Sequence, residues 1–549
     1  MATQQALCLP EIVSNILRQV WENTQYCKFE WGVPVEYNCY FERNGSLMSC
    51  ILVNKLWAAE GTNIIWGEKE DDECFTSVDG PRLQYYANKI REIRIRHNKI
   101  SQPVSSLASI PLSHLHFPRL SSLTLKTPFN APTSELIPFL TPRLRTIKLV
   151  SSKPSEMDRI VSDIWPLVKK YCPRLERMVF SNLPSGGRKI PADELVSFLS
   201  AMPSINDVNL NSAKIELTLP LFMYLAQRPL IYKLSLFRPG FFGKEMATYE
   251  TLRDYLVRVD TRQTQNSSPF WSHRPIAHPI FPHLEVLKLM SPVELFGALQ
   301  SHISRIKDLK LRLWPYCGSS DLTGEVRTAR VDYVLSCSSR FADLRRLEVH
   351  FASGAGVYTE NLTTPLQFQG GSLLKLAEGC RSLEVLHLTG YVGLNATGLS
   401  DEVIDKAAKL LPRLSSLLLQ LDRGSEESEL TERTLQSLGR HCRRMKVCRI
   451  RAPINLLLQT DENCLFPRLC HLAVGARTQV DYKVHHSEVN ALQQVLLHHF
   501  PALVFLDSWR YLRRTNTDFD QKDQSTVYES PWDYETINDF LDQRQSIFQ

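Results

Sequence analysis

FPRLSSLTLKT (117–127) and TPRLRTIKLV (141–150) carry the pattern that decides the fold. Each phrase has an apolar residue, two others, an apolar residue, one other and an apolar residue. The last two apolar positions lie two residues apart, as on one face of a short strand, and the first turns the chain into that strand. The pattern returns in CPRLERMVF (172–180), FPHLEVLKLM (281–290), CRSLEVLHLTG (380–390) and LPRLSSLLLQ (411–420).

Weaker copies of the phrase continue along the chain, and their first apolar residues are Ile90, Ile205, Ile231, Ile306, Leu344, Met445, Leu469 and Leu503. About fourteen copies stand mostly about 22 to 39 residues apart, which overlaps and somewhat exceeds the period of leucine-rich repeats. Segments 193–205 and 402–414 lie between copies, have helical apolar spacing, and contain a proline that ends the helix. One strand–turn–helix unit cannot close a core, whereas stacked units can. The sequence therefore predicts an α/β fold over 90–510: a curved leucine-rich-repeat solenoid with parallel strands inside and helices outside. A run of separate α/β domains is the alternative.

Length and charge agree with an elongated protein. The 549 residues are too many for one ordinary core. A net charge of +6 gives no reason to expect a protein that coats nucleic acid. No uncharged apolar run approaches the roughly 18 residues that cross a bilayer, and the N-terminus lacks a signal-peptide pattern. We expect a soluble protein of the cytoplasm, the nucleus or both, with scattered, mostly reduced cysteines, a loop insertion at about 238–280, and loops at 356–371 and 421–432.

The first seventy residues form a different module. Residues 9–20 and 47–57 each place apolar side chains on one helical stripe, and a third stripe ends at Ile64, Ile65 and Trp66. Three short amphipathic helices make a poor independent core, because little chain carries much apolar surface. A helical partner would cover that surface. Residues 71–89 are expected to be a linker or first cap.

The blocks L-P-E-I-V-x-x-I-L (9–17) and S-C-x-L-V-N-K-x-W (49–57), with a closing Trp66, resemble the F-box motif in its fungal form. Ahead of leucine-rich repeats, they imply a substrate receptor of the Skp–cullin–F-box ubiquitin ligases: the F-box docks the Skp-family adaptor and through it a cullin, and the repeats capture the target for ubiquitination. The chain departs from the family in an insertion at about 21–46. The adaptor-facing residues that the resemblance implies are Leu9, Pro10, Ile12, Ile16, Leu17, Leu52, Val53, Lys55, Trp57 and Trp66.

No catalytic or metal-binding motif is present, so we expect no enzyme activity, no metal and no cofactor. In the ligase scheme the chemistry belongs to the ubiquitin-conjugating enzyme. Two other classes stay open. One is a leucine-rich scaffold unconnected to ubiquitin. The other, a nucleic-acid binder, rests on the basic runs at 91–99 and 442–451, which more often mark solvated strand faces. We expect neither a nucleic acid nor a membrane as partner.

Strand alternation predicts a basic concave face, which would bind an acidic or phosphorylated segment of the target. Its cations are Arg94, Arg96, Lys126, Lys148, Arg177, Lys233, Lys288, Lys310, Arg312, Arg346, Arg449 and Arg451, and its acids are Glu92, Asp207, Asp308, Glu348 and Asp507. Phe237, Phe505 and Trp509 share the face and could anchor apolar residues of a peptide. The last segment, 511–549, is acidic and is expected to be a tail or a cap of the solenoid.

Overall fold

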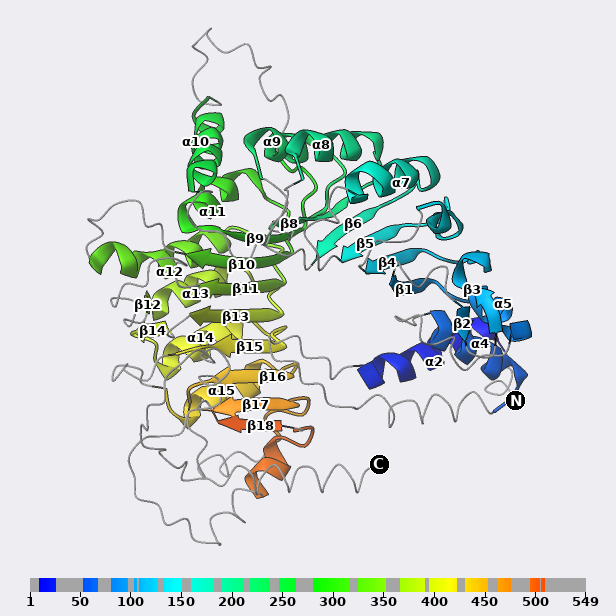
Figure 1. The fold of residues 1–549 in the computed structure, drawn as a ribbon. Helices are drawn as coiled ribbons and strands as arrows, with labels where there is room; N and C mark the ends of the chain where they lie inside the picture. The colour runs from blue at the N-terminus through cyan, green and yellow to red at the C-terminus, as the bar shows by residue number, and fades with distance from the viewer. Residues whose placement is uncertain are drawn as a thin grey trace, which may run out of the picture. The chain divides into compact units, whose positions relative to one another are not determined.

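The computed structural model describes residues 9–25, 53–67, 80–96, 103–105, 108–126, 133–150, 159–181, 190–210, 217–236, 246–262, 280–314, 324–351, 366–390, 394–421, 430–452, 463–474, 494–503 and 505–508. The chain divides into two compact units, Met1–Leu221 and Phe222–Gln549. Both are built from parallel strands that alternate with helices (Figure 1).

Every copy of the apolar phrase begins a strand two residues after its first apolar residue, which confirms the repeat prediction. The strands of the first unit are β1 (Glu92–Arg96), β4 (Ser122–Lys126), β5 (Thr146–Val150), β6 (Arg177–Ser181) and β7 (Asp207–Asn209). Those of the second are β8 (Lys233–Leu236), β9 (Val286–Pro292), β10 (Asp308–Trp314), β11 (Arg346–Phe351), β13 (Val385–Gly390), β15 (Ser416–Leu419), β16 (Val447–Ile450), β17 (His471–Val474) and β18 (Phe505–Ser508). Within each unit these strands pair in parallel and in this order.

The turn before each strand explains why the phrase repeats. The amide of Leu383, the first apolar residue of its copy, donates to the carbonyl of Cys380 at 3.0 Å. The carbonyl of Arg345, in the preceding repeat, then accepts from the amides of Glu384 and Val385 at 2.7 and 3.0 Å. The same two-donor contact links repeats along both units, so it fixes the register from one repeat to the next.

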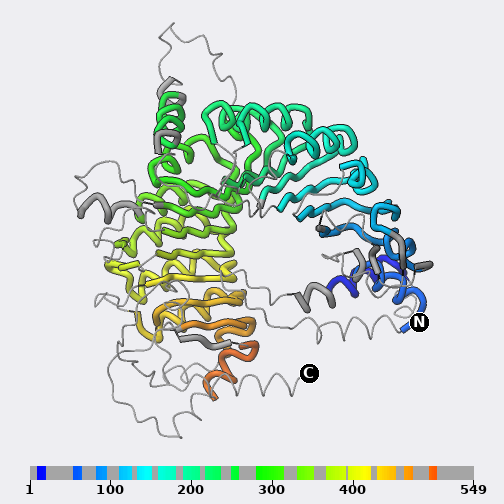
Figure 2. Tube along the Cα trace, viewed as in Figure 1, coloured from blue at the N-terminus to red at the C-terminus, as the bar shows by residue number. Residues whose placement is uncertain are grey.

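Helices connect the strands, and the Cα trace in Figure 2 shows the repeats as stacked turns. In the first unit these are α5 (Gly80–Ala87), the 3-10 helices η3 (Leu112–His114) and η4 (Thr133–Phe139), the π-helix η5 (Ile160–Ile164), α7 (Trp165–Tyr171) and α8 (Ala192–Ala201), and α9 (Leu219–Gln227) crosses into the second. The second unit has α10 (Met246–Arg262), α11 (Val293–Leu299), η6 (Gln300–His302), α12 (Gly324–Ser338), α13 (Gly370–Gly379), α14 (Asp401–Leu410) and α15 (Glu432–His441). Figure 1 shows α12 to α15 along one side of the second unit's strands.

Burial follows the predicted alternation in β5, β10 and β11, whereas β4, β8, β15 and β16 bury residues of both faces. In β10, Leu309, Leu311 and Leu313 are at most 1% exposed, while Lys310 and Arg312 between them are half-buried. The helices cover the leucine side of the strands. Helices α8 and α14 end at Ala201 and Leu410, two residues before Pro203 and Pro412. The prolines therefore act as the predicted stop signals.

Two segments differ from the expected loops. Helix α10 occupies residues 246–262 of the insertion predicted at about 238–280. Residues 366–369 of the segment 356–371 form β12 (Leu366–Gln369), which pairs in parallel with β14 (Leu394–Thr397), and α13 begins at Gly370. Of 421–432, residues 422–429 lie outside the described part of the chain. In the first unit, β2 (Pro103–Ser105) and β3 (Ala108–Pro111) form an antiparallel pair.

The N-terminal module contains α2 (Pro10–Gln25) and α4 (Lys55–Gly67), which pack on each other through Val13, Leu17 and Ile64. Of the helix expected over 47–57, residues 47–52 lie outside the described residues, 53 and 54 are not helical, and 55–57 form the start of α4, which runs on to Gly67. Asn54 precedes the helix, and its side-chain oxygen accepts from the amides of Leu56 and Trp57 at 2.9 and 3.1 Å. Asn54 thus caps α4 and sets its start.

Candidate functional site

The side of the strands that faces away from the leucine core carries most of the charged side chains of the described strands. We call it the strand face of each unit. Among the side chains that the structure describes in the second unit, it consists of Lys233, Ser235, Val286, Lys288, Met290, Asp308, Lys310, Arg312, Arg346, Glu348, His350, Val385, His387, Thr389, Ser416, Leu418, Val447, Arg449, His471 and Ala473.

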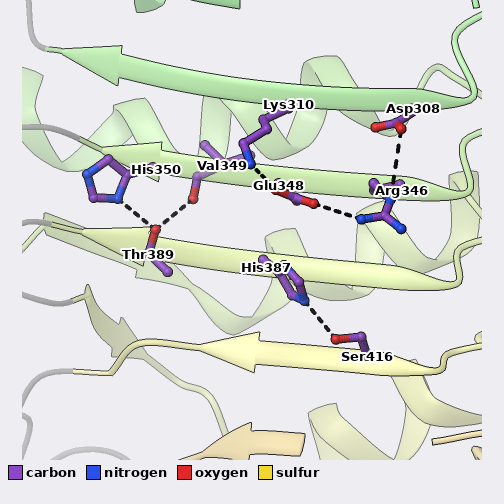
Figure 3. Close-up of polar contacts among 9 residues, drawn as sticks. All are labelled: Asp308, Lys310, Arg346, Glu348, Val349, His350, His387, Thr389 and Ser416. Atoms are coloured by element: carbon purple, nitrogen blue, oxygen red, sulfur yellow. Dashed lines mark hydrogen bonds and ion pairs between the residues drawn. The ribbon is translucent and has the colours of Figure 1, made fainter. Parts of the chain in front are cut away.

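Two carboxylates hold two of the basic residues of this face in place (Figure 3). Glu348 accepts from Lys310 Nζ at 2.8 Å and from Arg346 Nη1 at 3.0 Å. Arg346 Nε also lies 3.8 Å from Asp308 Oδ2. Burial is the largest single influence and by itself would raise the pKa of Glu348. The hydrogen bond and charge of Lys310, together with His387 and Arg346, outweigh it, so the pKa is lowered. Lys310 and Arg346 are therefore largely neutralised within the protein.

Two histidines continue the face onto β11 and β13. His350 Nδ1 lies 2.8 Å from the hydroxyl of Thr389, which donates to the carbonyl of Val349 at 3.3 Å (Figure 3). The tautomer with the proton on Nδ1 lets His350 donate to Thr389 while the hydroxyl donates to the carbonyl of Val349. His387 Nε2 lies 2.8 Å from Ser416 Oγ. Burial lowers the pKa of both histidines to about 4, so both are neutral at physiological pH.

A third histidine and a buried arginine lie farther along the same face. Arg449, which is 8% exposed, donates through Nε and Nη2 to His471 Nε2 at 3.2 and 2.9 Å. Burial first, and then the neighbouring guanidinium, lower the pKa of His471 to about 3. Arg449 is thus held against a neutral ring below the surface, and this corrects the expectation that it grips the target directly.

The remaining predicted basic residues differ in their burial and in their ion pairs. In the first unit Arg177 pairs with the buried Asp207 at 3.0 Å, and Arg94 and Lys148 are half-buried. In the second, Lys288, Arg312 and Arg451 are half-buried. The side chain of Arg96 and the whole of Trp509 lie outside what the structure describes.

The N-terminal helices carry the expected docking residues. Leu9 and Val53 are 50% and 61% exposed, and Pro10 and Lys55 are also exposed. Ile12, Ile16 and Trp57 are half-buried. Leu17 is fully buried against Val13 and Ile64. Leu17 therefore belongs to the contact between the helices, and we withdraw it from the docking set. Leu52 and the side chain of Trp66 lie outside the described residues. The sequence pattern was not used to predict that Asn54 caps α4, although an asparagine just before an amphipathic stripe is a known signal for the start of a helix.

No cluster of three or more His, Cys, Asp or Glu side chains suited to a metal occurs among the residues that the structure describes. Cys172, Cys380 and Cys442 end helices and are buried, and burial raises the pKa of each thiol to about 12. Such thiols are poor nucleophiles. None of the described helices has the length and apolar content to cross a bilayer.

No protein-family model matches the chain, and a search of the curated proteins finds no match. Among solved structures, the chain is similar to one in "Crystal structure of TLR13-ssRNA13 complex", with a TM-score of 0.33 and 10% sequence identity. The match covers 78% of this chain and 58% of that one. So weak a likeness carries no argument about function. The strand order and the repeated turns by themselves fit a leucine-rich-repeat solenoid.

Proposed function

We propose that the chain is the substrate-recognition subunit of a Skp–cullin–F-box ubiquitin ligase. In this proposal the N-terminal helices dock the Skp-family adaptor and the repeats bind the target protein. The observation that carries it is the pair α2 and α4, whose sequence blocks resemble the F-box. Pro10 at the start of α2, and Leu9 and Val53 just before the two helices, are exposed.

The small core of the helix pair supports a role in docking. Among the described residues of α2 and α4, the fully or nearly fully buried hydrophobic side chains are Val13, Leu17 and Ile64. Burying three such side chains contributes about 5–9 kcal/mol. Ordering the 16 and 13 residues of the two helices costs about 1–2 kcal/mol per residue. Backbone hydrogen bonds offset part of this cost, but a partner that covers Leu9 and Val53 would add the burial that the pair lacks.

The repeats supply the second half of the proposed function. Their strands present a row of polar side chains on each unit, held by backbone pairing to neighbours on both sides. Ion pairs and hydrogen bonds fix several of these side chains before any partner arrives, which lowers the ordering cost of binding. A preformed polar surface of this kind suits recognition of a folded protein or a peptide.

Affinity purification from cells tests the proposal. The chain is tagged and compared with a Leu9→Ala, Pro10→Ala variant. We expect the intact chain to recover a Skp-family adaptor together with a cullin, and the variant to lose both at once while its repeats stay folded. Equal recovery of the adaptor by the variant, or a wild-type chain that recovers neither protein, would contradict the proposal. The second outcome would favour a scaffold unconnected to ubiquitin.

A further inference from the structure

The positive charge on the strand face of the second unit is concentrated at one end. Among the described residues of this face, β8 to β11 contribute five cations, namely Lys233, Lys288, Lys310, Arg312 and Arg346, and two carboxylates, Asp308 and Glu348. The described strand-face residues of β13 and β15 carry no lysine, arginine, aspartate or glutamate. Farther along, β16 adds Arg449, which is buried against His471. The excess of accessible positive charge on the described strand face therefore lies at β8 to β11.

Lys288 and Arg312 carry the part of this charge that no direct contact with a described carboxylate neutralises, although Lys288 acts on Asp308 at longer range. Lys310 and Arg346 engage the two carboxylates, whereas neither Lys288 nor Arg312 makes a hydrogen bond or ion pair to any residue that the structure describes. Arg312 Nε is buried without a partner, and burial lowers the pKa of its guanidinium. A buried donor without a partner is costly and rare in native proteins.

The strand register brings these groups together. Lys288 on β9 pairs directly with Lys310 on β10, and Arg312 follows two residues later on the same face. Like charges directly opposite each other across two strands destabilise a sheet. Arg312 in turn lies opposite His350, which is neutral, so no negative group of β11 faces it in the register. Three cations thus converge on this part of the face, and among the described residues only Lys310 of the three contacts a carboxylate.

We propose that Lys288, Lys310 and Arg312 bind a phosphorylated side chain of a partner protein. The inference rests on the proposed function, in which the repeats capture a target. A phosphate group carries about −1.5 to −2 charges and three acceptor oxygens in one compact group. One phosphate group can accept hydrogen bonds from the Arg312 guanidinium and from both lysines at once, and it supplies the acceptor that Arg312 Nε lacks.

The limited extent of the charge selects a phosphate over a run of acidic residues. An acidic peptide would need cations along its whole length, but the neighbouring positions on β13 and β15 include Val385, His387 and Leu418. His387 is neutral, and the other two are apolar and buried. This part of the face suits the uncharged residues that flank one phosphorylated position.

Binding of peptide pools to the full-length chain at 0.15 M salt tests the site. The probes are three fluorescent degenerate peptide pools whose central residue is phosphoserine, serine or glutamate. We expect the phosphoserine pool to bind at least tenfold more tightly than the other two. The double variant Lys288→Gln, Arg312→Gln should lose that preference, whereas Arg381→Gln removes one exposed positive charge outside the strand face and should keep it.

Stability and adaptor capture are measured on the same preparations. Because Arg312 Nε has no partner to lose, the double variant should melt no lower than the wild type. If the double variant does melt lower, the single variant Lys288→Gln replaces it in the binding assay. Equal binding of the three pools, or an unchanged preference in the variants, overturns the inference. Adaptor capture should be the same in all variants, so its absence would count against the proposed function and not against the phosphate site.

Discussion

Replacing His387 by glutamine should change how the stability of the second unit depends on pH. His387 is 9% exposed, and burial lowers its pKa to about 4 from an ordinary value of 6.5. A histidine whose pKa is lowered by folding stabilises the protein fully above pH 6.5, and this contribution is lost as the pH falls toward 4. Acid should therefore destabilise the wild type more than His387→Gln.

The magnitude follows from the two pKa values. At pH 5 the unfolded chain protonates His387 almost completely, while the folded chain keeps it mostly neutral. Because pH 5 lies 1.5 units below 6.5, the ordinary pKa that His387 has in the unfolded chain, protonation of the unfolded chain lowers the free energy of unfolding by about 2 kcal/mol relative to neutral pH. Glutamine can still bond to Ser416 through an atom close to the position of Nε2, so the variant should differ from the wild type chiefly in titration.

Hydrogen exchange over peptides that cover β13 and β15, at pH 7.5 and 5.0, measures this effect locally. The free energy of opening should fall by about 2 kcal/mol more in the wild type than in His387→Gln. His114→Gln, at an exposed position of the first unit, is the control and should match the wild type. If His387→Gln and the wild type lose the same stability on acidification, then the burial argument for the neutral histidines is wrong.

Two further predictions concern the packing of successive helices. A Cβ on Gly379 would clash with the carbonyl oxygen of Ser339, so Gly379→Ala should lower the free energy of unfolding by about 1–3 kcal/mol. Gly371→Ala in the same helix meets nothing within 4 Å and should be neutral or stabilising by up to about 1 kcal/mol, and urea unfolding that shows the same sign for both contradicts the close helix approach. Asp401 accepts hydrogen bonds from the backbone amide and the hydroxyl of Thr431 at 2.9 and 2.5 Å, so Asp401→Ala should lower the free energy of unfolding by about 2–4 kcal/mol. Amide hydrogen exchange at the start of α15 should become faster, and unchanged exchange there would contradict this role.

The strands could be predicted from the sequence because each repeat contains the residues that its own turn and strand require. A buried residue such as Leu383 must close the turn, and Leu386 and Leu388 must point into the core. These demands leave an apolar signature in every copy. The pair β12 and β14 left no such signature, because its residues LQFQ and LNAT mix apolar and polar side chains in segments rich in turn formers.

The candidate site was predictable in position but not in detail. Alternation identified which cations share the strand face, since side chains at every second position point the same way. It could not show that Arg449 is buried against His471, or that Lys310 is paired with Glu348 while Lys288 is not. Those differences depend on contacts between strands far apart in the sequence, for which a single phrase carries no signal.

Direct binding of the purified full-length chain to a Skp-family adaptor tests the central claim most directly. Calorimetry should show specific binding by the wild type and at least a tenfold loss for Leu9→Asp, Val53→Asp, because both side chains are at least half exposed at the proposed contact. Leu230→Asp replaces an apolar side chain that is 56% exposed in the second unit and should bind like the wild type. A wild-type chain that does not bind the adaptor, or a double variant that binds it as tightly, would contradict the proposed docking of the N-terminal helices.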